Sequence, residues 1–288
     1  MPELPEVETI RRGLSSEIVG LKIKSIATNE PKMLQLGDVG TKAVVGAQVK
    51  DIRRRAKILL IDLDNGFSLL IHLKLTGQLI YQNIEGGKII GDSPVPPLNK
   101  PTPNATTHIT ITFDNATHLF FNDLRKFGYV KLFSTKEIEN LKVMQEFGPE
   151  PFTPGFSLEY FREGLKKRGR TNVKVLLLDQ SFIGGIGNIY ANEALYEARI
   201  SPLRSAVSLS DNEVKKLYSA IMEVLERGLK AGGASDQTYV NAFGEKGRFM
   251  ETAKVYGRLN QSCKECSGNV KRITLGGRGT FYCPSCQK

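Results

Sequence analysis

The cysteine pattern near the end of the chain places the strongest constraint on how it can fold. All four cysteines fall within one short stretch, as the pairs Cys263-x2-Cys266 and Cys283-x2-Cys286. This spacing is typical of a four-thiolate zinc site, to which each pair supplies two tetrahedral ligands. Such a site leaves no position open for a substrate, so the predicted zinc ion is structural. Two disulfides or unliganded buried thiols are the alternatives.

The net charge indicates a polyanionic partner. The 288 residues carry 40 Lys and Arg against 30 Asp and Glu, a formal net charge of +10. Such an excess is typical of proteins that bind nucleic acid or an acidic membrane surface. Residues 1–150 hold 19 of the basic and 17 of the acidic side chains, and residues 151–288 hold the other 21 and 13. The second half is therefore the better candidate for the contact with a polyanion.

Membrane insertion and secretion find no support in the sequence. The longest aliphatic runs, such as Ile58–Ile61 and Val175–Leu178, are far shorter than the roughly 20 residues of a membrane span. The N-terminus is rich in Pro and Glu and lacks the basic start and the apolar stretch of a signal peptide. We expect a cytoplasmic protein, associated with the nucleoid if it binds DNA, and no membrane partner.

Hydrophobic periodicity predicts an α+β fold. Residues 3–14 predict a short helix, and from about 21 to 133 the pattern is typical of strands, with a hairpin signal at Asp64-Asn65-Gly66. Residues 83–106 are rich in Gly, Pro and Asn and predict a long loop. This part of the chain predicts an N-terminal antiparallel β-sandwich with flanking helices.

After a proline-rich stretch at 149–154 the period becomes helical. Ser157 predicts one helix cap, Asn188 a cap for 189–198, and Ser210 with Glu213 a capping box. A further helix is predicted over 172–180. The last residues return to short strands around the cysteines, which predicts a zinc β-hairpin.

Two glycine-rich turns in this second half suggest phosphate contacts. Gly276-Gly277-Arg278-Gly279 lies between the two cysteine pairs and predicts a hairpin tip that presents Arg278 to a phosphate backbone; an arginine on a solvated turn is the alternative. The turn at 184–187 delivers backbone N–H groups and Asn188 to a helix N-terminus, a natural anion site. A plain helix cap explains that turn equally well.

The N-terminus carries the most distinctive candidate chemistry. Removal of Met1 would expose the secondary amine of Pro2. A terminal amine has an ordinary pKa near 8 and is partly neutral at pH 7, so it can attack an electrophilic carbon and form an iminium. Glu3 is placed to shuttle protons and Glu6 to orient the pair. A disordered terminus is the alternative.

These motifs occur in an order that resembles the formamidopyrimidine-DNA glycosylase family. The resemblance begins with Met1–Thr9 followed by Arg11–Leu14 and covers nearly the whole chain. The further matching segments are 53–60, 72–77, 121–128, 148–151, 177–180, 185–193, 201–204, 256–258 and 277–287.

The resemblance implies a domain organisation and an activity. It implies a catalytic β-sandwich domain at 1–134, a linker at 135–155, a helical H2TH (helix–two-turn–helix) DNA-binding domain at 156–255 and a zinc hairpin at 256–288. The implied activity is that of a base-excision repair glycosylase with AP lyase activity on oxidised purines. The implied partner is double-stranded DNA with an oxidised purine or an abasic site, bound by a bacterial monomer that holds one structural Zn²⁺.

The resemblance also implies roles for individual residues. Pro2 would attack C1′ of the damaged nucleotide, Glu3 would protonate the sugar ring oxygen, and Lys57 would act near the lesion and its phosphate. Arg278 joins this catalytic set as a phosphate ligand at the kinked strand. The implied DNA contacts are His72, Leu75, Arg125, Phe127, Lys174, Asn188 and Tyr239, and the implied zinc ligands are Cys263, Cys266, Cys283 and Cys286.

The sequence departs from the family pattern at a few positions. Leu75 stands where the family usually has Met, and Asp236-Gln237-Thr238 replaces the usual residues of the loop that covers the everted base.

Two rival functions are open alternatives: an endonuclease VIII-like enzyme for oxidised pyrimidines, and a non-catalytic zinc protein that binds damaged DNA. Residues 4–9 and 125–127 favour the purine branch, and the presence of Pro2 and Lys57 argues against a non-catalytic protein.

Overall fold

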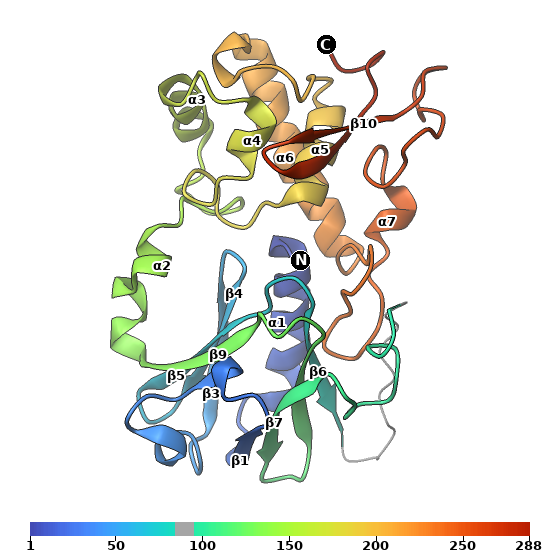
Figure 1. Cartoon of the computed structure of the whole chain (residues 1–288). Helices are drawn as coiled ribbons and strands as arrows, with labels where there is room; N and C mark the ends of the chain where they lie inside the picture. The colour runs from blue at the N-terminus through green and yellow to red at the C-terminus, as the bar shows by residue number, and fades with distance from the viewer. Residues whose placement is uncertain (84–94) are drawn as a thin grey trace. The chain divides into compact units, whose positions relative to one another are not determined.

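The computed structural model describes residues 1–83 and 95–288, which form two compact units (Figure 1). The first unit comprises Met1–Gln145 and Ala231–Arg248, and the second comprises Glu146–Lys230 and Phe249–Lys288. Ala231–Arg248 therefore packs with the first unit, whereas the resemblance implied a helical domain running through 156–255. Tyr239 and Ala242 explain this, since both lie in the hydrophobic core that includes the first helix. Of the predicted loop at 83–106, residues 84–94 lie outside the described residues, and 95–106 contain no named helix or strand.

The described part of the first unit contains two β-sheets, in agreement with the predicted α+β fold. A four-stranded sheet has the order β1-β7-β8-β6 and a five-stranded sheet the order β2-β9-β5-β4-β3, in which β2 and β9 are parallel and the other pairs antiparallel. The strands are β1 (Ile23–Thr28), β2 (Leu34–Gln35), β3 (Val49–Arg55), β4 (Ile58–Leu63), β5 (Phe67–His72), β6 (Gly77–Gln82), β7 (Thr107–Phe113), β8 (His118–Asp123) and β9 (Tyr129–Ser134). The helical elements are α1 (Leu4–Ile18), η1 (Pro31–Met33), η2 (Gly40–Ala43), η3 (Thr135–Asn140) and α2 (Lys142–Gln145).

Helix α1 and two hairpin turns set the geometry of this unit. The helix is longer than the predicted 3–14, because Ile18 continues the buried face of Ile10 and Leu14. The hairpin predicted at Asp64-Asn65-Gly66 joins β4 to β5. A second hairpin, at Ala56-Lys57, joins β3 to β4 and was not predicted, because neither residue is typical of turns.

The second unit is helical and ends in the zinc hairpin. Its elements are α3 (Leu158–Lys167), α4 (Val173–Leu177), α5 (Asn188–Glu197), η4 (Ala206–Ser208), α6 (Asp211–Lys230), α7 (Phe249–Thr252), β10 (Lys271–Leu275) and β11 (Arg278–Tyr282). Throughout 1–83 and 95–288, each helix is too short or too polar to cross a membrane.

The predicted helix caps of this unit are confirmed at two of three positions. Ser157 Oγ accepts a hydrogen bond from the Tyr160 N–H at 3.1 Å, and the Glu213 carboxylate accepts from the Ser210 N–H at 2.8 Å. The third prediction is wrong: Gly187 is the N-cap of α5 and Asn188 is its first helical residue. The Asn188 side chain is used elsewhere, as described below. The helix predicted over 172–180 covers only Val173–Leu177.

Candidate active site and nucleic-acid interface

The start of α1 is organised by two buried carboxylates. Glu3 is the N-cap residue, and its N–H donates to the carboxylate of Glu6 at 2.7 Å in a capping box. The other oxygen of Glu6 accepts from the Ala234 N–H, also at 2.7 Å. Glu6 therefore ties the helix start, where Pro2 is also buried, to the segment Ala231–Arg248.

Tyr239 lies in the same segment, Ala231–Arg248. Its side chain is buried, and its hydroxyl donates to the carbonyl oxygen of Gly232 at 3.0 Å. Burial and then the charge of Glu6 raise the pKa of Tyr239 well above its ordinary value, so the hydroxyl keeps its proton. The resemblance made Tyr239 a DNA contact, whereas the structure packs it inside the first unit. Its buried side chain and its hydrogen bond to Gly232 suit a residue that supports the segment Ala231–Arg248.

The terminal amine lies in surroundings that favour its neutral form. Burial lowers the pKa of the Met1 amine from its ordinary value, Glu3 and Glu6 oppose this shift, and the positive charge of Lys57 adds to it. The expected loss of Met1 would leave the amine on Pro2, beside the same carboxylates. A lowered amine pKa increases the fraction of nucleophile at neutral pH.

Lys57 and His72 belong to the same electrostatic environment. Lys57 is 6% exposed in the β3–β4 turn, and its charge acts on His72 as well as on the terminal amine. Burial, followed by the charges of Lys74 and Lys57, lowers the pKa of His72 to about 3. His72 is therefore neutral at pH 7, and its Nδ1 accepts the Lys74 N–H at 3.0 Å. The ring proton must then lie on Nε2, which makes that atom a donor for a phosphate oxygen.

Two loops of the first unit present the predicted wedge residues. Phe127 is 53% exposed, which excludes the core packing that a lone Phe would normally suggest. The Arg125 guanidinium lies 4.7 Å from the centre of the Phe127 ring. Leu75 lies half-buried in the loop between β5 and β6. Apolar side chains of this kind are suited to fill a kinked base step.

A single carboxylate that was not predicted fixes both loops. Asp123 is fully buried and accepts hydrogen bonds from the N–H groups of Arg125 at 3.1 Å and Gly128 at 2.7 Å. The hydroxyl of Thr76, next to Leu75, donates to the same carboxylate. The relative position of the two wedge loops therefore depends on Asp123.

The hairpin of the second unit exposes Arg278 as predicted. Gly276 and Gly277 both have positive φ (54° and 71°), as a type I′ turn requires, and Arg278 follows as the first residue of β11. Helix α5 supports the hairpin, since Asn188 Nδ2 donates to the Gly279 carbonyl oxygen at 2.9 Å. Lys174, by contrast, is 0% exposed, and the phosphate contact that the resemblance implies for it stays a prediction.

Glu193 is a second organising residue without a predicted role. It is fully buried on α5, and its carboxylate accepts the backbone N–H groups of Lys254 (2.8 Å), Val255 (2.9 Å) and Tyr256 (2.8 Å). These three residues lead into the zinc hairpin. The local sequence signal for this role is an acidic residue at a buried position of a helix.

The cysteine site has the geometry of a zinc centre. All four cysteines are free thiols, which excludes the disulfide alternative, and their Sγ atoms lie within 4.8 Å of one another. The Cys263–Cys286 and Cys266–Cys283 sulfur atoms are 3.8 and 3.6 Å apart. Tetrahedral thiolates at about 2.3 Å from Zn²⁺ would be separated by about 3.8 Å. The four cysteines therefore form a site for one structural zinc ion.

Models of known families match three segments of the chain. Residues 1–130 match the formamidopyrimidine-DNA glycosylase N-terminal domain, residues 147–240 the H2TH domain of the same proteins, and residues 260–288 the zinc finger found in FPG and IleRS. The chain is 41% identical to a formamidopyrimidine-DNA glycosylase of Desulforamulus reducens, over 100% of this chain and 99% of that protein. A Heliobacterium modesticaldum protein of the same name is also 41% identical, over 100% of both chains.

Solved structures agree with the sequence relatives. The Lactococcus lactis Fpg in complex with abasic-site DNA has a TM-score of 0.87 and 34% identity, over 99% of both chains. The MutM (Fpg) protein of Thermus thermophilus has a TM-score of 0.85 and 35% identity, over 99% of this chain and 98% of that one. The fold and the site thus define a zinc-finger protein of the H2TH class. Within that class, the chain belongs to the formamidopyrimidine-DNA glycosylase family.

Proposed function

We propose that this protein excises oxidised purines, chiefly 8-oxoguanine and formamidopyrimidines, from double-stranded DNA and then cleaves the resulting abasic site. The observation that carries the proposal is the buried start of α1: Pro2 and Glu3 are buried there beside the Glu6 carboxylate, and burial lowers the pKa of the Met1 amine at the same place. Two similar structures support the substrate class, since a Lactococcus lactis Fpg mutant holds Fapy-dG DNA and a MutM holds DNA with a carbocyclic 8-oxo-G.

The first step is attack by the neutral Pro2 amine on C1′ of the damaged nucleotide. The N–C1′ bond forms as the bond from C1′ to the base breaks, and the base leaves with the proton that the amine nitrogen loses. Glu3 protonates the ring oxygen, the sugar opens, and the C1′–amine adduct becomes an iminium. Loss of a C2′ proton expels the 3′ phosphate, a second elimination expels the 5′ phosphate, and hydrolysis of the iminium returns the amine.

The remaining residues make C1′ accessible and hold the strand. The nucleotide must leave the duplex before the amine can reach it, at a cost of a few kcal/mol. Leu75, Arg125 and Phe127 fill the space that it leaves. Nε2–H of His72 and the exposed Arg278 bind phosphates, and Lys57 acts close to the lesion. We further propose that the protein acts as a monomer associated with the bacterial nucleoid.

Borohydride trapping tests this proposal directly. Borohydride reduces the iminium to a stable amine, so protein without Met1 should form a covalent adduct with an 8-oxoguanine duplex and with an abasic duplex. Oxidised pyrimidine duplexes in the same panel should react more slowly. The matched control retains one extra residue ahead of Pro2, which should abolish the adduct and leave duplex binding unchanged. Absence of an adduct from correctly processed protein would refute the proposal.

A further inference from the structure

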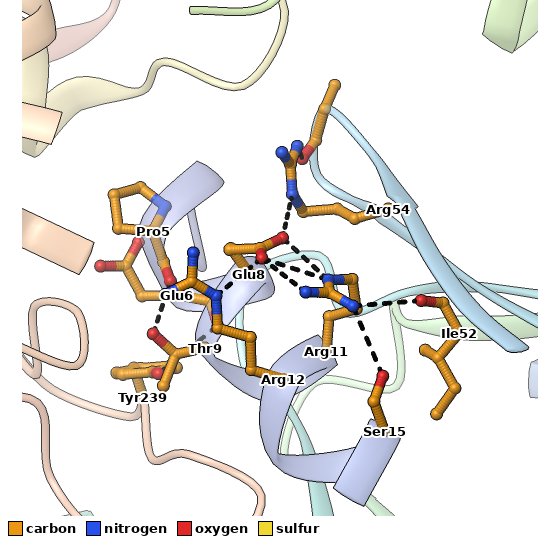
Figure 2. A network of polar contacts seen from close by, with 11 residues as sticks. Pro5, Glu6, Glu8, Thr9, Arg11, Arg12, Ser15, Ile52, Arg54 and Tyr239 are labelled. Carbon is orange, nitrogen blue, oxygen red and sulfur yellow. Dashed lines mark hydrogen bonds and ion pairs between the residues drawn. The ribbon is translucent and has the colours of Figure 1, made fainter. Parts of the chain in front are cut away.

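A cluster of charged side chains beside the candidate active site has no role in the chemistry described so far. Figure 2 shows Glu8 of α1 at its centre, surrounded by three arginines. The Glu8 carboxylate accepts hydrogen bonds from Arg11 at 2.9 Å, Arg12 at 2.9 Å and Arg54 at 3.1 Å. Burial opposes ionisation of Glu8, but these three hydrogen bonds hold its pKa to about 2. Glu8 is therefore a permanent anion at neutral pH.

The three arginines are not equivalent. Arg11 and Arg12 lie on α1 itself, three and four residues beyond Glu8, and the Arg12 side chain is 61% exposed. Arg54 lies on β3, and its side chain is 14% exposed. The contact between Glu8 and Arg54 therefore joins helix α1, which directly follows Pro2 and Glu3, to strand β3.

Arg54 also contacts the turn that follows its strand. Its Nε donates to Glu8, while its Nη1 donates to the carbonyl oxygen of Ala56 at 3.0 Å. Ala56 has a φ of 50°, in the left-handed region that residues with a side chain seldom adopt. Lys57 is the next residue along the chain. The Arg54 guanidinium therefore connects helix α1 to the backbone turn that orients Lys57.

We propose that Arg54, anchored by Glu8, is a positioning residue that keeps the Ala56-Lys57 turn in the conformation that directs the Lys57 ammonium to the active site. This inference rests on the proposed function, because Lys57 is taken to act near the lesion. The geometry requires an arginine, since the planar guanidinium places two donors in fixed directions, whereas a lysine has a single charged nitrogen. Arg54 need not contact DNA to fulfil this role.

The test compares Arg54 with its neighbour on β3. Arg53→Met is the matched control, because Arg53 also donates two side-chain hydrogen bonds, but both go to Asp62, at 2.5 and 3.1 Å, and neither reaches the Ala56 turn. Single-turnover excision from an 8-oxoguanine duplex should slow by about 100-fold in Arg54→Met, since a small misplacement of a catalytic group costs that much. Arg54→Lys should slow it comparably, and Arg53→Met should leave it within about twofold of wild type. Duplex affinity should stay unchanged in all three, and thermal unfolding identifies any variant that fails to fold.

A double-mutant cycle separates positioning from a general structural role. If Arg54 acts through Lys57, Arg54→Met should add little to the defect of Lys57→Met, because the side chain that it positions is already gone. An equal slowing of excision in both backgrounds overturns the proposal. Wild-type trapping is measured in the same series, so that its absence refutes the proposed function and its presence with an additive cycle refutes only the role of Arg54.

The pH profile provides an independent readout. Because the charge of Lys57 lowers the pKa of the terminal amine, displacement of that ammonium should raise the amine pKa. The acid limb of the pH–rate profile should then move to higher pH in both Arg54 variants and remain in place in Arg53→Met. An unshifted limb in a folded Arg54→Lys protein with slowed excision would also contradict the proposal.

Discussion

Each unit of the protein contains a buried glutamate that holds a distant segment of backbone, yet the two have different consequences. Glu6 in the first unit accepts the N–H groups of Glu3 and Ala234, and Glu193 in the second accepts three consecutive N–H groups at 254–256. Glu6 also acts on the terminal amine, whose pKa its charge raises. Glu193 secures only the approach to the zinc hairpin, and burial raises its own pKa.

A buried glutamate that accepts backbone N–H groups therefore serves a different purpose in each unit. In the first unit the buried charges lie where the proposed reaction occurs, so a change in charge alters both the fold and the chemistry. In the second unit a carboxylate and a metal site stiffen a surface that exposes Arg278. We therefore expect damage to the second unit to weaken DNA binding, and damage to the first to slow bond cleavage. Four predictions test this division.

The largest expected effect is that of zinc removal. Structural zinc contributes about 10–16 kcal/mol to the folding of small zinc domains, so Cys283→Ser or chelation should unfold the β10–β11 hairpin. Affinity for an abasic duplex should fall by more than about 100-fold, which corresponds to roughly 3 kcal/mol. Trapping of a free abasic sugar, which needs only the first unit, should persist. Lost trapping with intact duplex binding would contradict a structural zinc.

The next effect separates the two glutamates. Glu193→Gln leaves at least one backbone N–H poorly paired in a buried site and should lower the free energy of unfolding by about 1–3 kcal/mol. Duplex affinity should fall with it, while trapping of a free abasic sugar stays near wild type. Glu6→Gln should lower stability by a similar amount and also slow that trapping. Denaturant titration and trapping on both variants check this, and equal trapping rates would remove the proposed distinction.

A smaller difference, about 1–2 kcal/mol in the free energy of unfolding, is expected between two glycines of positive φ. Gly233 (φ 93°) has no space for a side chain, because a Cβ there would lie 2.8 Å from the Tyr239 ring and 3.0 Å from the Glu6 side chain. Gly277 (φ 71°) has nothing within 4 Å of that position. Gly277→Ala should therefore cost only the backbone strain, about 1 kcal/mol, and Gly233→Ala about 2–3 kcal/mol, with slower trapping. Equal losses in urea unfolding would show that the contacts of Gly233 relax freely.

The smallest effect concerns acid stability. Hydrogen bonds from arginines hold the pKa of Glu8 in the first unit and of Glu213 in the second to about 2, from an ordinary 4.5. A lowered carboxylate pKa stabilises the fold fully above pH 4.5 and progressively less as the pH falls toward 2. Glu8→Gln should therefore flatten the loss of stability between pH 4.5 and 2, and the more exposed Glu213→Gln should do so less. Unfolding measured at several pH values decides, and a steeper loss in either variant would contradict the assignment.

Local signals predicted much of the fold and part of the site. The caps at Ser157 and Ser210 and the turn at Asp64-Asn65-Gly66 are decided by neighbouring residues, and the structure confirms them. The Ala56-Lys57 turn escaped prediction because neither residue is a usual turn former, and its conformation is supported by Arg54 contacts across the fold. Asn188 was assigned to a cap for the same reason: its partner, Gly279, is remote in the sequence.

By itself the sequence determined the zinc ligands, the nucleophile candidate and the family, because spacing and order along the chain carry that information. Tertiary structure alone decided that Ala231–Arg248 joins the first unit, that Asp123 fixes two loops and that Arg54 links Glu8 to the turn before Lys57. The physical reason is burial. A carboxylate or a guanidinium removed from water must find hydrogen-bond partners, and in a folded chain those partners come from segments that no local pattern connects.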